Sequence, residues 1–87
     1  MTISDVKIRK RYTEGKLKAL VSITIDNCIA IHDLKVIDGT QRLFVAMPSR
    51  KENDGTFRDI VHPISTEARE ALEQLVLEAY NNEEIVY

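Results

Sequence analysis

The sequence predicts an α+β domain in which a curved antiparallel sheet of four or five strands is covered by one C-terminal helix. Through most of residues 1–62, apolar and polar side chains alternate, which is typical of strands with one buried face. After residue 65 the period changes, and apolar residues recur three and four positions apart, as they do on one face of a helix. At 87 residues, the chain is expected to fold as one domain spanning residues 1–87.

The first two strands are predicted at SDVKIRKRY and LKALVSITI, with a turn at the intervening TEGK. In the first segment, Val6 and Ile8 share one side, and Lys7 and Arg9 share the other. In the second, five apolar positions fall on one face, which is the strongest strand signal in the chain. Gly15 can adopt the positive φ that a tight turn requires, so the two strands are predicted to pair as a hairpin.

A third strand is predicted within CIAIHDLKVI, after a tight turn at Asp26–Asn27. The apolar phase slips by one position between Ile31 and Leu34, which predicts a bulge or bend near His32–Asp33. DGTQR reads as a further turn. The continuous apolar run LFVAM then predicts a buried strand that ends at Pro48, because proline cannot donate to a strand ladder.

The next segments are a polar loop, SRKENDG, with Asp54–Gly55 as its turn, and a short strand at TFRDIV. A helix is predicted over residues 65–80, capped by Ser65 or Thr66, with Asn81–Asn82 ending it and residues 81–87 forming a frayed tail. Leu77 is predicted to be a single exposed leucine, and packing on a partner chain is the alternative. The apolar stripe of the helix comprises Ala68, Ala71, Leu72, Leu75, Val76 and Ala79.

The size of the chain favours a homodimer. A domain this short buries only roughly 60–65% of the surface that its unfolded chain exposes, so it is marginally stable alone. One helix cannot cover five strands, and the remaining apolar surface, with Leu20, Phe44 or Phe57 among it, needs another lid. A second subunit is the simplest lid.

Several features predict a cytoplasmic protein without membrane contact. The longest apolar runs are about five residues, whereas a membrane-spanning helix needs about 20. The first residues lack the apolar segment that is typical of a signal peptide. Cys28 is the only cysteine, so no intrachain disulfide can form.

Charge is distributed unevenly along the chain, whose formal net charge is −2. Residues 1–62 contain 11 Lys and Arg against 8 Asp and Glu, whereas residues 63–87 contain one Arg against six Glu. A mildly basic body of this kind can bind phosphate groups while its acidic tail repels them. An alternative is that these cations only solvate strand ends and discourage edge pairing. The candidate nucleic-acid-binding residues are Arg9, Lys10, Arg11, Arg50, Lys51 and Arg58.

The sequence predicts no catalytic residues, no metal site and no cofactor. Cys28 lies in a strand-like run, where a small hydrophobic residue is expected, and His32 and His62 are thirty positions apart. No residue spacing matches a zinc site, and no glycine-rich loop opens a helix to bind phosphate. A small polar cluster of the two histidines would require the fold to bring them close.

The segment LFVAMPSRKENDGTFRDIVHPIS closely resembles the SpoVG family, the stage V sporulation protein G or septation regulators of bacteria. The family pattern, roughly LFVAMPS[KR]…DG.[FY]RDI.HPI, is matched at every fixed position. The similarity continues backwards through ITIDNCIAIHDLKVIDG and the opening DVKIRK…GKLKALVSIT. It implies an α+β homodimer, a cytosolic regulator without known catalytic activity that binds DNA and RNA with some sequence preference. The family is linked to cell division, sporulation and the expression of surface and virulence traits.

The resemblance also implies roles for individual residues. Arg50 falls on the Lys or Arg that follows MPS, Lys51 extends it, and Arg58 falls on the arginine of RDI. Asp59, His62 and Pro63 are interpreted as fold determinants, with Asp59 available to orient Arg58. The chain departs from members that grip DNA with a basic helix, because Arg69 is the only cation of its acidic C-terminal helix. A protein-interaction module in septum formation, with division proteins as partners, is therefore the alternative function.

Overall fold

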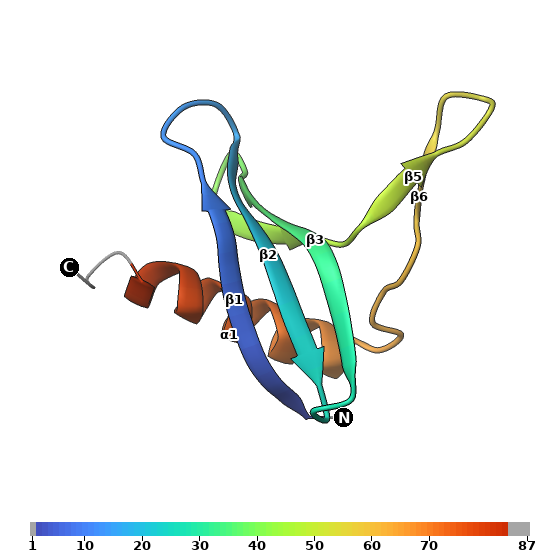
Figure 1. Cartoon of the computed structure of the whole chain (residues 1–87). Coiled ribbons are helices and arrows are strands. Elements are labelled where there is room, and N and C mark those ends of the chain that lie inside the picture. The colour runs from blue at the N-terminus through green and yellow to red at the C-terminus, as the bar shows by residue number, and fades with distance from the viewer. Residues whose placement is uncertain (1, 84–87) are drawn as a thin grey trace.

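The computed structural model describes residues 2–83 and confirms the predicted α+β fold. A four-stranded antiparallel sheet has the order β1-β2-β3-β4, and a separate two-stranded sheet is formed by β5 and β6. The helix α1 lies behind the four-stranded sheet and crosses its strands, whereas β5 and β6 extend away from it (Figure 1). The elements are β1 (Ile3–Arg11), β2 (Leu17–Ile25), β3 (Ile29–Asp38), β4 (Leu43–Ala46), β5 (Ser49–Lys51), β6 (Phe57–Asp59) and α1 (Thr66–Glu83).

The predicted irregularity in the third strand is a β-bulge. Val21 pairs with Leu34 and Ile23 pairs with Ile31, so β3 contains one more residue than β2 between these two pairs. Asp33, within the bulge, has a φ of 67°. The extra residue restores the apolar phase, because it returns the following side chains to the buried face of the sheet.

The hydrophobic core lies between the four-stranded sheet and α1. Alternate residues of β2 supply its centre, and Val21 is completely buried. The core is closed by two helix residues one turn apart, and its buried members are Ala19, Val21, Ile23, Leu34, Val36, Val45, Met47, Leu72 and Val76. This packing buries only one face of the sheet, which we call the inner face, and leaves the opposite outer face uncovered in the described chain.

The helix packs with a face that matches the predicted stripe at Leu72 and Val76 but differs from it elsewhere. Ala71 and Leu75 are exposed, and Leu77 and Tyr80 pack partly buried against the core. The prediction that Leu77 is exposed was therefore wrong. Polar side chains of α1 contact the edge strand β4. The Val45 N–H donates to Glu73 Oε2 at 3.1 Å, and the Val45 carbonyl accepts from Arg69 Nη2 at 3.1 Å.

Three further details of the elements differ from the prediction. Residues 49–51 of the predicted polar loop form β5, and the returning strand β6 pairs with β5 rather than with the main sheet. The helix continues through Asn81–Asn82 to Glu83, so these residues are helical and not part of a frayed tail. Residues 84–87 of that predicted tail lie outside the described residues. Within residues 2–83, no helix has the length and apolar character required to cross a bilayer.

Candidate nucleic-acid interface

The β5–β6 arm, which we define as residues 49–59, projects away from the four-stranded sheet (Figure 1). At its base the N–H of Ile60 donates to the carbonyl of Pro48 at 2.8 Å. Toward its tip the Glu52 N–H donates to the Thr56 carbonyl at 2.7 Å, and Gly55 takes a φ of 91° that suits glycine. Backbone hydrogen bonds therefore shape the arm as a two-stranded ribbon with solvent on both faces.

The register of the arm distributes its cations over both faces. Arg50 pairs with Arg58, so these two guanidinium groups share one face. Lys51 pairs with Phe57 and, as the next residue after Arg50, lies on the other face. All four residues are exposed. The arm thus brings the three predicted cations together on one ribbon but not on one surface.

The predicted role of Asp59 in orienting Arg58 is wrong. The Nε of Arg58 instead forms an ion pair with Glu52 Oε1 at 3.4 Å. Asp59 follows Arg58 directly on β6 and therefore lies on the opposite face, where it pairs with Ser49. Alternation along a three-residue strand separates neighbours in sequence onto different surfaces.

A second group of cations lies on the outer face of the four-stranded sheet. Lys10, Leu20 and Lys35 form one row across β1, β2 and β3, because Leu20 pairs with both lysines. Lys7 pairs with Ser22, two positions farther along β2. The neighbours of Leu20 in sequence, such as Val21, are buried under the helix, so this row points away from it.

Arg9 is held on the same outer face by a polar network. Its Nε donates to Ser22 Oγ at 3.2 Å, and the same hydroxyl lies 2.8 Å from His32 Nδ1. Ser22 is 7% exposed although it faces outward, because Arg9 and His32 lie beside it. We call Lys7, Arg9, Lys10 and Lys35 the basic outer face.

Sequence reasoning did not select Lys7 or Lys35. Lys7 could have been found from its alternation with Arg9 along the first strand. Lys35 can be assigned to the same face only when the extra residue of the bulge at His32–Asp33 is taken into account. The assignment also requires knowledge of the pairing of β2 with β3. The apolar residues predict the bulge, whereas its effect on the charged residues becomes clear only from the strand pairing.

Lys10 and Arg11 point to opposite faces of the sheet, and a bulge at Arg9 decides which of the two points outward. The register of β1 shifts between Ile8 and Lys10, after which Lys10 pairs with Leu20 and Arg11 pairs with buried Ala19. Arg11 therefore points to the inner face, where its Nη2 donates to the Tyr80 carbonyl at 2.7 Å. Its guanidinium carbon lies 4.6 Å from the centre of the Tyr80 ring. The three consecutive cations thus do not form one patch.

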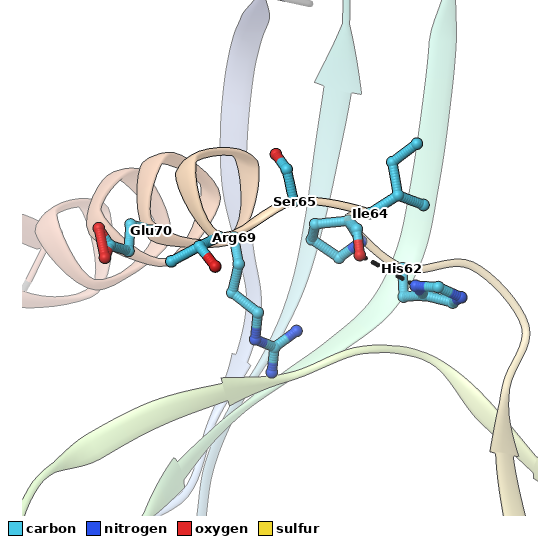
Figure 2. Close-up of a pocket in the computed structure, with 7 residues that line it drawn as sticks. His62, Ile64, Ser65, Arg69 and Glu70 are labelled. Atoms are coloured by element: carbon cyan, nitrogen blue, oxygen red, sulfur yellow. Dashed lines mark hydrogen bonds between the residues drawn. The ribbon is translucent and has the colours of Figure 1, made fainter.

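The two histidines have different surroundings. His32 contacts Ser22 on the sheet, whereas the Nδ1 of His62 lies 2.9 Å from the Pro63 carbonyl, in the connection between the arm and α1. Figure 2 shows His62 and Arg69 among the residues that line a shallow hollow at the start of the helix, and the guanidinium group of Arg69 reaches β4. Ser65 caps the helix, because its Oγ accepts from the Ala68 N–H at 3.1 Å.

Comparison with known proteins gives one consistent match. A family model described as SpoVG matches residues 1–82. A protein of Lachnospira eligens named "Putative septation protein SpoVG" is 56% identical over 86 residues, which cover 99% of this chain and 98% of that protein. Proteins with the same name from Clostridioides difficile and Exiguobacterium sp. are 57% and 54% identical and cover 93% and 98% of this chain. The share of their own lengths that is covered is 88% and 86%. The range matched by the family model includes both groups of cations.

Proposed function

The chain belongs to the SpoVG family, and from this membership we propose that it acts in septation as a cytoplasmic regulator that binds DNA or RNA without catalysis. Relatives that carry the septation name match it over nearly their whole length. The family resemblance supplies the expectation of nucleic-acid binding and of a homodimer. The charge distribution of the fold supports the binding surface.

The observation that carries the proposal is an excess of cations on the outer face, which also carries Asp5 and Asp33. Lysines and an arginine gather on the outer face of the sheet, whereas the helix on the inner side carries Arg69 as its only cation. Lys10 and Lys35 are two strands apart, roughly 10 Å, because neighbouring strands are about 4.8 Å apart. An acidic protein can therefore hold a polyanion, since the sheet separates the polyanion from the acidic helix.

The arm adds a second contact of a different kind. Arg50 and Arg58 face each other, and a phosphate group between them would relieve their mutual repulsion. Carboxylates at Glu52, Asp54 and Asp59 balance the three cations of the arm. The arm therefore contributes a local contact with one phosphate, whereas the basic outer face attracts the polyanion over a longer distance.

A second candidate function is a protein-interaction module in septum formation. The observation that favours it is the acidic surface of α1, where Glu67, Glu70 and Glu78 are exposed. Such a surface fits a basic segment of a division protein. This candidate predicts capture of a protein partner through these glutamates and no binding of nucleic acid.

A salt titration of binding tests the proposal. Each phosphate that the protein neutralises contributes about 0.9 to the slope of log affinity against log salt for duplex DNA, and about 0.7 for single strands. We expect the triple variant Lys7→Gln, Lys10→Gln, Lys35→Gln to reduce this slope by roughly 2 to 3. Lys16→Gln, in the turn between β1 and β2, is the control and should leave the slope nearly unchanged. An unchanged slope in the triple variant would reject the basic outer face as the binding surface.

A further inference from the structure

One aromatic side chain of the arm is largely exposed in the part of the chain that the structure describes. Phe57 is 71% exposed at the start of β6, on the arm that projects from the sheet. It lies directly opposite Lys51, so an apolar ring and an ammonium group share this face of the ribbon. An exposed ring beside a cation is the combination that proteins use to stack a base and neutralise the adjoining phosphate.

The same face of the arm carries hydrogen-bonding groups. Asp59 is two positions from Phe57 on β6, so both side chains point to one side, together with Ser49, which pairs with Asp59. A hollow beside the strand is lined by Phe57, Arg58, Asp59 and His62. We call Ser49, Lys51, Phe57 and Asp59 the Phe57 face.

The Asp59 carboxylate indicates which part of a nucleic acid would bind beside it, a base or a phosphate. Among residues 2–83 this carboxylate has no hydrogen-bond or ion-pair partner, since the nearby Arg58 pairs with Glu52. A carboxylate repels phosphate, but it accepts hydrogen bonds from the N–H groups on the pairing edge of a base. The group next to Asp59 is therefore expected to be the edge of a base, with the phosphate placed at Lys51.

We propose that the Phe57 face binds an unpaired base of single-stranded nucleic acid, stacking it on Phe57 with its pairing edge at Asp59 and the adjoining phosphate at Lys51. The inference rests on the proposed nucleic-acid binding and specifies that the bound strand is single. A duplex does not satisfy this face, because its bases are stacked on one another and their pairing edges are occupied. The basic outer face contacts only the backbone, so it binds both kinds of strand.

Fluorescence anisotropy with a labelled 12-nucleotide single strand and with its duplex, at one salt concentration, tests the proposal. We expect Phe57→Leu, which keeps an apolar side chain but removes the ring, to weaken single-strand binding by about 5- to 150-fold. Duplex binding should change by less than about twofold, because backbone contacts remain. Phe57→Tyr keeps the ring and should restore single-strand binding. Ile64→Ala removes a side chain that is 91% exposed outside the arm and is the matched control.

The outcomes separate this inference from the function on which it rests. If the wild-type protein binds neither strand, the proposed function fails. If it binds both, and Phe57→Leu weakens them equally or not at all, the inference is overturned and the proposed function stands. Light scattering of the same variants tests the competing occupant, because a dimer that dissociates on Phe57→Leu would show that Phe57 packs on a second copy. The circular dichroism spectrum of Phe57→Leu is expected to match that of the wild type, which shows that the variant is folded. Loss of single-strand binding in Phe57→Tyr, which keeps the ring, would count against the inference.

Discussion

Arg50 and Arg58 lie directly opposite each other on the β5–β6 arm, so two guanidinium groups share one face of a two-stranded ribbon. Like charges in this position disfavour strand pairing, by an amount comparable to the roughly 0.2–1 kcal/mol that a favourable cross-strand pair contributes. The arm retains this arrangement although a neutral residue at either position would relieve the repulsion. The ion pair of Arg58 with Glu52, at 3.4 Å, offsets part of this repulsion, and the remaining excess of positive charge favours the binding of an anion.

Replacing Arg50 separates these two effects. We expect Arg50→Gln to raise the free energy of unfolding by a few tenths of a kcal/mol, because the repulsion with Arg58 is removed. The same change should lower the salt slope of nucleic-acid binding by about 0.7 to 0.9. Thermal unfolding and a salt titration measure the two quantities. Lys51→Gln is the control, since Lys51 faces Phe57 and its loss should give no gain in stability. A loss of stability in Arg50→Gln would contradict the prediction.

Arg11 and Lys10 are neighbours in sequence with opposite expected roles. Arg11 places a cation at the carbonyl of Tyr80, in a helix whose own last turn has no basic residue. We expect Arg11→Gln to lower the free energy of unfolding by about 1–2 kcal/mol, through the lost charged hydrogen bond and the lost interaction with the helix dipole. Lys10→Gln should leave stability nearly unchanged and reduce the salt slope of binding. Urea unfolding and salt titration of both variants check this, and the reverse pattern would place Arg11 in the binding surface.

Glu73 protects the edge of the sheet. Its carboxylate accepts from the Val45 N–H at 3.1 Å and from Arg42 Nη1 at 3.0 Å. We expect Glu73→Ala to lower the free energy of unfolding by about 1–3 kcal/mol, because a part-buried backbone donor loses its partner. Glu70→Ala, one turn earlier on the exposed side of α1, should change it by less than about 0.5 kcal/mol.

Glu73→Ala also leaves the Val45 N–H of the edge strand β4 without its acceptor, which has a second consequence. An edge strand with an unpaired N–H can pair with another chain, so this variant should aggregate at a lower concentration than Glu70→Ala. Light scattering during urea unfolding measures both properties. Equal stability and equal aggregation of the two variants would show that the Glu73 contact with β4 does not protect the edge.

The tip of the arm predicts a pH dependence. The hydroxyl of Thr56, and then its backbone N–H, donate to the Asp54 carboxylate and hold the pKa of Asp54 below its ordinary value of 3.8. Since the folded pKa is the lower one, the stabilisation from this contact is complete above pH 3.8 and is lost as the pH falls through the folded pKa. Carboxyl NMR titration should place Asp54 below 3.8 in wild type and closer to 3.8 in Thr56→Val. An Asp54 pKa that is the same in both proteins would refute the role of the hydroxyl.

Local patterns predicted much of the fold. The alternation from Leu17 to Ile25, the bulge at His32–Asp33 and the cap at Ser65 each depend on a few neighbouring residues, and the structure contains all three. The pairing of β5 with β6 was not predicted, because each strand has only three residues and too short a pattern to distinguish from a loop. The packed face of α1 was predicted correctly at Leu72 and Val76, which are buried. It was wrong at Leu75, which is exposed, because the periodicity of the helix does not include contacts with other strands, such as that of Glu73 with β4.

The sequence by itself determined the α+β class, the hairpin of β1 and β2, the uneven charge along the chain and the resemblance to its family. Only the tertiary structure decided which cations share a surface. One extra residue in a strand reverses the side to which every later side chain points, so the bulge before Lys10 sends Arg11 to the helix. Strand pairing then brings Lys35 to Lys10 across Leu20, a relation between three strands that no local pattern contains.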